Sequence, residues 1–92
     1  MDQRVSLYLG NIEQSYRHVH EAIECYLVIR GKLEIEVEDE SVILSDDDLL
    51  VINMNQVHLI KGNKKNLILC LRFEKEYLEE ECRELLYQTI QC

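Results

Sequence analysis

The stretch HVHEAIECYLVIRG, residues 18–31, combines possible metal ligands with the pattern of a β-strand. His18 and His20 are two residues apart, so their side chains point to the same side of an extended chain. Glu24 follows four residues after His20 and opens an apolar run, residues 24–29, that ends just before Gly31. β-branched and aromatic residues in this run favour a strand, and the glycine favours a turn after it. We therefore expect three polar side chains to converge at the start of this strand.

The rest of the chain also alternates between apolar and polar residues, which predicts strands with one buried and one wet face. The alternating apolar positions include Val5, Leu7 and Leu9, and then Leu33, Ile35 and Val37. Turn-forming residues interrupt the pattern at 30–32, 38–41, 45–48, 53–55 and 61–65. Short strands separated in this way predict a mainly β domain, either a sandwich or a barrel, over residues 1–73.

From residue 74 to residue 92 the apolar spacing changes to that of an amphipathic helix. The predicted apolar side of this helix consists of Leu78, Cys82, Leu85, Leu86 and Ile90. The strand at 24–29 is apolar on both faces, so its outer face needs a cover, which the helix could supply. The helix could equally pair with a second copy, because a chain of 92 residues builds only a small core. We therefore expect a homodimer formed through the helix.

Charge and cysteine content exclude several classes of protein. The chain has 18 acidic and 10 basic residues, a net charge of −8, so this segment should be repelled by nucleic acid. Four cysteines without a CxxC pair, no leader and no apolar run of membrane-spanning length predict a cytoplasmic protein without membrane contact.

A fourth possible ligand, His58, follows the predicted turn at 53–55. Together with His18, His20 and Glu24 it would form a set of three imidazoles and one carboxylate, which suits Zn, Fe, Mn, Ni or Cu. The same four side chains could instead hydrogen-bond to one another and hold no metal. Tyr26 shares the face of Glu24 and belongs to the same predicted pocket.

Two segments resemble the motifs of the cupin superfamily. The first is His18-x-His20-x3-Glu24-x6-Gly31, and the second is Asp47-Asp48-x4-Asn53-Met54-Asn55-x2-His58. Asp47 and Met54 stand where cupins usually have a glycine and a proline. The resemblance implies a small cupin-type β-barrel of jelly-roll type, followed here by the predicted C-terminal helix over 74–92.

Within the cupins, residues 30–34 and 52–58 are similar to the N-terminal domain of AraC-type bacterial transcription regulators. This narrower resemblance implies a small-molecule effector, a dimer, and DNA binding through a separate helix-turn-helix region that these 92 residues do not include. The implied effector pocket comprises His18, His20, Glu24, Tyr26 and His58. The alternative is a stand-alone, metal-dependent cupin enzyme of dioxygenase or isomerase type. The acidic charge and the terminal helix favour the regulator, so we assign no catalytic residue.

Overall fold

The computed structural model describes residues 3–14 and 21–81, and these form seven strands and one helix. In chain order the elements are β1 (Val5–Gly10), β2 (Ala22–Arg30), β3 (Leu33–Val37), β4 (Glu40–Leu44), β5 (Leu49–Ile52), β6 (His58–Lys61), β7 (Leu67–Glu74) and α1 (Lys75–Glu81). The mainly β class that the alternating pattern predicts is confirmed.

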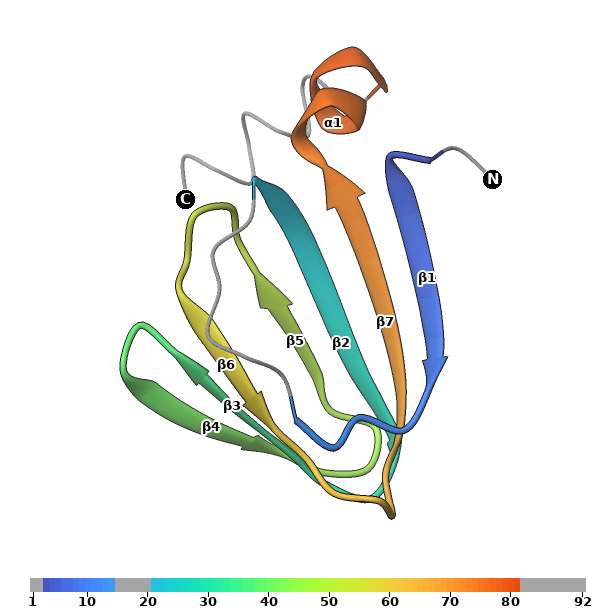
Figure 1. The fold of residues 1–92 in the computed structure, drawn as a ribbon, viewed down its shortest axis with the longest axis vertical. Coiled ribbons are helices and arrows are strands. Elements are labelled where there is room, and N and C mark those ends of the chain that lie inside the picture. Colours follow the sequence, from blue (N-terminus) through green and yellow to red (C-terminus); the bar gives the residue numbers. More distant parts are fainter. Residues whose placement is uncertain (1–2, 15–20, 82–92) are drawn as a thin grey trace.

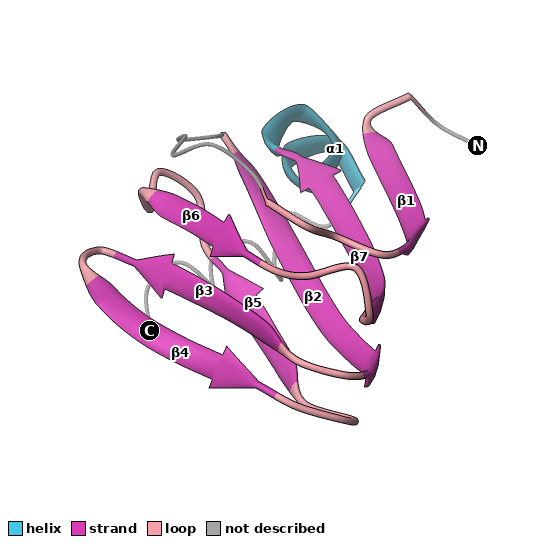
Figure 2. Ribbon diagram, turned by 60° about the horizontal axis from the view of Figure 1, so that its bottom comes forward, coloured by secondary structure: helices cyan, strands magenta, loops and turns pink. Residues whose placement is uncertain are grey.

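The strands form two antiparallel sheets that face each other (Figure 1, Figure 2). One sheet has the order β1-β7-β2-β5 and the other the order β4-β3-β6. Among the described residues, no ladder of hydrogen bonds joins one sheet to the other, so the predicted jelly-roll fold takes the form of two facing sheets with open edges. The chain crosses between the sheets at four connections, which are β2–β3, β4–β5, β5–β6 and β6–β7.

The core lies between the sheets and consists of the inward side chains of both. Its buried members are Tyr26, Val28, Leu33, Ile35, Leu44, Ile52, Ile60 and Ile68. On β3, Leu33 and Ile35 are buried while Glu34 and Glu36 face outward, as the alternation predicts. Glu34 accepts a hydrogen bond from Ser41, and Glu36 lies 3.7 Å from the Lys61 amine.

One buried asparagine ties the segment after β1 to the sandwich. The side chain of Asn66 is 5% exposed and exchanges two hydrogen bonds of 2.8 Å with the backbone of Ile12. It also donates to the Lys32 carbonyl over 3.2 Å. Next to it, a Cβ at Gly62 would come within 1.9 Å of the Ile12 carbonyl oxygen, so only glycine fits there. These contacts hold residues 11–14 against β6.

The described part of the predicted terminal helix is α1, which follows β7 directly. Leu78 is 8% exposed, and the Tyr77 ring lies 6.2 Å from the ring of Phe73 on β7. Arg4, just before β1, pairs with Glu80 at 2.6 Å. Leu78 is thus buried at the end of the four-stranded sheet. The other predicted interface residues, Cys82, Leu85, Leu86 and Ile90, lie outside the described residues.

A hydrophobic stretch of bilayer-spanning length occurs in no helix of residues 3–14 and 21–81.

Candidate functional site

Three of the predicted pocket residues meet between the sheets. β2 turns Glu24 and Tyr26 inward because they are two residues apart on one strand. His58 is the first residue of β6 and faces them from the opposite sheet. Their exposed fractions are only 4%, 3% and 1%, so the site is an interior polar cluster, which we call the Glu24–Tyr26–His58 cluster.

Each polar group in the cluster contacts another. The Nε2 atom of His58 lies 3.0 Å from Oε1 of Glu24, and the Tyr26 hydroxyl donates to Oε2 of Glu24 over 3.0 Å. The Nδ1 atom of His58 lies 3.1 Å from the carbonyl oxygen of Gln56. A carbonyl can only accept, so Nδ1 carries a proton. His58 and Glu24 must then share a second proton between Nε2 and Oε1, as an imidazolium–carboxylate pair or its neutral form.

The surroundings of the cluster influence its protonation. Burial by itself would lower the pKa of His58, but the hydrogen bonds to Glu24 and Gln56 and the charge of Glu24 outweigh it and raise that pKa. Burial also raises the pKa of the Tyr26 hydroxyl, and the neighbouring Cys70 and Glu24 raise it further. Tyr26 therefore stays protonated and donates to Glu24, and the raised pKa shifts His58 toward its charged form.

The turn before His58 is held by a side chain and not by a proline. The Asn53 amide donates to the Gln56 side-chain oxygen over 2.9 Å, and Asn55 adopts a left-handed φ of 63°. Asparagine tolerates this conformation better than most residues do. Gln56 thus orders the turn through its side chain and orients His58 through its backbone carbonyl.

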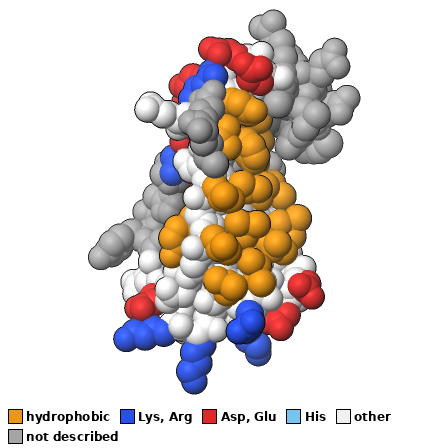
Figure 3. All heavy atoms as spheres, turned by 90° about the vertical axis from the view of Figure 1, so that its right-hand side faces the viewer, with side chains coloured by type: hydrophobic (Ala, Val, Ile, Leu, Met, Phe, Trp, Pro, Cys, Tyr) orange, Lys and Arg blue, Asp and Glu red, His pale blue; other side chains and the backbone are white. Residues whose placement is uncertain are grey.

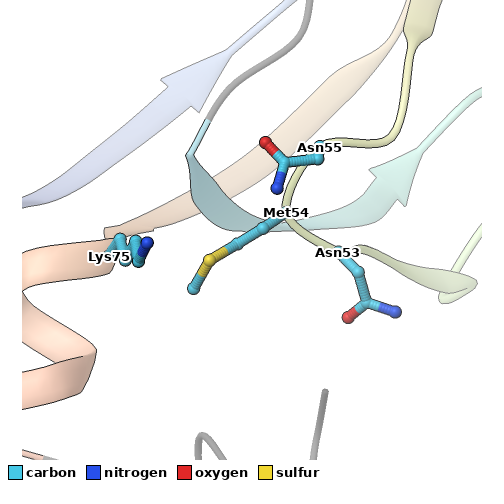
Figure 4. A pocket seen from close by; sticks show the side chains of 4 residues that line it. All are labelled: Asn53, Met54, Asn55 and Lys75. Carbon is cyan, nitrogen blue, oxygen red and sulfur yellow. The ribbon is translucent and has the colours of Figure 1, made fainter. Parts of the chain in front are cut away.

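A cavity of about 260 Å³ lies between the turn that precedes β6 and the start of α1 (Figure 4). Its lining residues are Asn53, Met54, Asn55 and Lys75. Glu24 pairs with Ile52 across the β2–β5 ladder, so Asn53 stands one residue beyond the partner of Glu24. Figure 4 shows the Met54 side chain extending toward Lys75, the first residue of α1. The cavity therefore offers two amides, one thioether and one amine.

The predicted metal site is described only in half. His18 and His20 lie outside the described residues, while Glu24 and His58 contact each other directly. Within the described ranges, no group of three or more His, Cys, Asp or Glu side chains is placed to hold a metal ion. Protein metal sites supply at least three ligands as a rule, so the described residues do not fit a metal by themselves.

Sequence reasoning missed the residues that support the cluster. Cys70 and Arg72 on β7 lie beside Tyr26 and Glu24 in the ladder, and Gln56 orients His58. Burial, followed by the charge of Glu24, raises the pKa of Cys70 to about 11. The alternation of Ile68, Cys70 and Arg72 along one face of the last strand was the available signal.

A family model described as "Cupin domain" matches residues 8–71, which is well over half of the chain. This chain belongs to the cupin family. The predicted superfamily and fold class are thereby confirmed.

Solved structures agree on the cupin fold. A cupin superfamily protein from Desulfitobacterium hafniense superposes with a TM-score of 0.71 at 21% identity, covering 80% of this chain and 71% of that one. A cupin-2 domain-containing protein from Shewanella frigidimarina gives 0.70 at 20% identity, covering 80% and 74%. A protein of unknown function from Streptococcus pyogenes gives 0.71 at 13% identity, covering 80% and 68%. No curated protein matches the sequence.

Proposed function

We propose that this cupin domain is the effector-binding and dimerisation domain of a cytoplasmic AraC-type transcription regulator. The observation that supports an effector site is the Glu24–Tyr26–His58 cluster, in which a carboxylate, a phenol and an imidazole are held in fixed positions. Small-molecule sites are usually apolar enclosures with a few such convergent polar groups. A cluster whose side chains hydrogen-bond to one another therefore suits the recognition of a ligand better than catalysis.

The cavity lined by Asn53, Met54, Asn55 and Lys75 suggests the class of effector. Its volume of about 260 Å³ is just below the range for small-molecule pockets, about 300 to 1,000 Å³, so the effector must be small. The Lys75 amine supplies a positive charge, while Asn53 and Asn55 can both donate and accept hydrogen bonds. We propose a small, polar, anionic effector. DNA would be bound elsewhere in such a regulator, since this domain has a net charge of −8.

A thermal-shift series with small carboxylates and sugar phosphates as probes tests the effector site. We expect at least one probe to raise the melting temperature of the wild type, since a ligand that binds only the folded state stabilises it. Lys75→Met and Tyr26→Phe should each raise the dissociation constant of that probe about tenfold, which corresponds to about 1.4 kcal/mol of binding free energy. Lys64→Met, which removes an exposed amine from the turn before β7, is the matched control. Equal weakening in all three variants would contradict this site.

The regulator assignment has its own test. It predicts two helix-turn-helix units encoded downstream of Cys92, and a stop codon at that position would contradict it.

One observation favours the second candidate, a metal-dependent cupin enzyme. Two of the four predicted ligands, Glu24 and His58, lie 3.0 Å apart from opposite sheets. Metal analysis of protein purified without chelator tests this candidate, in comparison with His58→Gln. Nearly one equivalent in the wild type and a loss in the variant would support the enzyme. Less than about a tenth of an equivalent in the wild type would contradict it, because real sites of this kind retain their metal.

A further inference from the structure

The outer face of the four-stranded sheet carries only apolar side chains. The ladders place them in rows that run across β1, β7, β2 and β5. One row is Leu7, Leu71, Cys25 and Val51, the next is Leu9, Leu69, Leu27 and Leu49, and Val5, Phe73 and Ile23 lie toward α1. We call these eleven residues the outer apolar face. Figure 3 shows hydrophobic side chains gathered over this side of the molecule, with charged side chains above and below.

Much of this face is open to solvent. The edge strands are the most exposed, with Leu9 and Leu49 at 60% and Leu7 at 52%. Isolated exposed leucines are ordinary, but a continuous patch is not. Helix α1 lies only at one end, where Tyr77 packs against Phe73.

The second sheet shows that composition alone does not cause this pattern. On its outer side, Ile43 is aligned with Glu34, and Glu34 is aligned with Lys61. The next row places Ser41 beside Glu36. One sheet thus has a charged outer face and the other an uncharged one.

Size and charge indicate which partner fits the outer apolar face. Four strands about 4.8 Å apart and about six residues long give a projected area of about 400 Å², before the relief of the side chains is counted. Apolar patches of a few hundred Å² mark interaction sites, and the smallest specific interfaces bury about 600 Å² on each partner. Each chain carries a net charge of −8, so the charged surfaces of two copies repel each other. Two copies can therefore associate most easily through an uncharged surface. A two-fold dimer places the same patch on both sides, and an apolar face is complementary to itself.

We propose that the outer apolar face binds a second copy of this chain, sheet against sheet. The proposal rests on the dimerisation part of the proposed function, but it places the interface on β1, β7, β2 and β5 and not on the predicted terminal helix. Sheets pack in this way at a separation of about 10 Å, with their side chains interdigitated. The dimer would bury Leu9 and Leu49 at the two edges of the face and Cys25 near its centre.

Light scattering coupled to gel filtration, over a dilution series from about 100 µM, tests the interface with the full chain. We expect the wild type to have twice the chain mass of 10.9 kDa at the highest concentration. Leu9→Glu and Leu49→Lys should each raise the dissociation constant at least about tenfold. Because the two variants change the net charge in opposite directions, a loss in both cannot come from overall repulsion. Far-UV circular dichroism and urea unfolding check that each variant folds.

Ile43→Glu is the matched control, because Ile43 is 65% exposed on an edge strand of the other sheet. It should dimerise as the wild type does. A wild type that is monomeric at the highest concentration overturns both the interface and the dimerisation part of the proposed function. Loss of the dimer in Leu85→Glu, with Leu9→Glu unaffected, overturns the outer apolar face alone and returns the interface to the predicted helix. Effector binding is measured separately and depends on neither result.

Discussion

The two faces of the four-stranded sheet are built in opposite ways from the same strands. On β2, Glu24 and Tyr26 turn inward, while Cys25 and Leu27 turn outward. The inner face thus buries a carboxylate beside the imidazole of His58, and the outer face exposes leucines. A buried polar group and an exposed apolar patch are both departures from the usual distribution, and both indicate function. The buried polar groups are tolerated because each contacts another polar group. The exposed apolar patch indicates that another molecule covers the sheet.

The largest expected effect comes from breaking the inner face. His58→Leu should lower the free energy of unfolding by about 3 kcal/mol, because it leaves Glu24 buried opposite a hydrocarbon. In the double variant Glu24→Leu, His58→Leu both ionisable groups are gone, and the loss should be smaller than in the single variant. Urea unfolding measures both. If the losses of Glu24→Leu and His58→Leu simply add in the double variant, the two side chains are not coupled.

The reactivities of Cys25 and Cys70 allow a direct comparison of the outer and inner faces of the sheet. Cys70 faces the core beside Tyr26, and its pKa of about 11 leaves only about one thiolate in 1,000 at pH 8. Burial raises the pKa of Cys25 as well, but this thiol lies on the outer apolar face. In dilute native protein we expect iodoacetamide to modify Cys25 before Cys70. We also expect Cys70 to react at least about 100-fold more slowly in the native protein than in the protein unfolded in urea. Peptide mapping by mass spectrometry follows each cysteine. Faster modification of Cys70 would place it outside the core.

A buried amide provides a neutral counterpart to the charged cluster. Asn66→Ala removes three hydrogen bonds and leaves the backbone groups of Ile12 and Lys32 without this partner. We expect a loss of about 2 kcal/mol in the free energy of unfolding. Asn63→Ala removes one exposed hydrogen bond to the Lys65 amide and should cost well under about 1 kcal/mol. Equal losses in urea unfolding would show that burial of Asn66 is not what matters.

The smallest effect is expected at the turn between β4 and β5, one of the four connections between the sheets. Asp47 has a φ of 70° and donates its amide to the Val28 carbonyl over 2.7 Å. Asp47→Gly removes the left-handed strain but adds freedom to the unfolded chain, so we expect a net gain of about 0.5 kcal/mol. Asp46→Gly should instead destabilise, because an Asp46 oxygen accepts from the Gly31 amide over 2.7 Å. Thermal unfolding of both variants shows whether the two signs differ. A loss of stability in Asp47→Gly would contradict the strain argument.

Much of the fold was predictable because alternation and turn chemistry are local properties. The strands at 5–9, 24–29 and 33–37 lie within β1, β2 and β3. The predicted turns at 45–48 and 53–55 fall between strands, and those at 30–32, 38–41 and 61–65 overlap the neighbouring strands by one or two residues. Tyr26 was predicted to share the face of Glu24, and it does so because a strand has a period of two. The structure also explains why cupins usually have a glycine at the position of Asp47, since this residue adopts the left-handed conformation that glycine favours.

The division of the strands into two separate sheets was not predictable in the same way. Two pairings would close the gap between the sheets, one of β1 with β6 and the other of β4 with β5. Each depends on hydrogen bonds across the sheet edges, and the local sequence of a strand does not specify them. Asn66 illustrates the same limit, because its partners Ile12 and Lys32 are 54 and 34 residues away. Nothing in the local sequence distinguishes this asparagine from its neighbour Asn63.

The sequence by itself determined the class of fold, the family motifs and which side chains share a face of each strand, because these follow from the period of the backbone. Only the tertiary structure decided that the His58 imidazole meets the Glu24 carboxylate at 3.0 Å and that the outer rows of β1, β7, β2 and β5 merge into one apolar face. The packing of the two sheets against each other sets the first result, and the order of strands in the four-stranded sheet sets the second. That order depends on pairing between distant segments, which no local pattern contains.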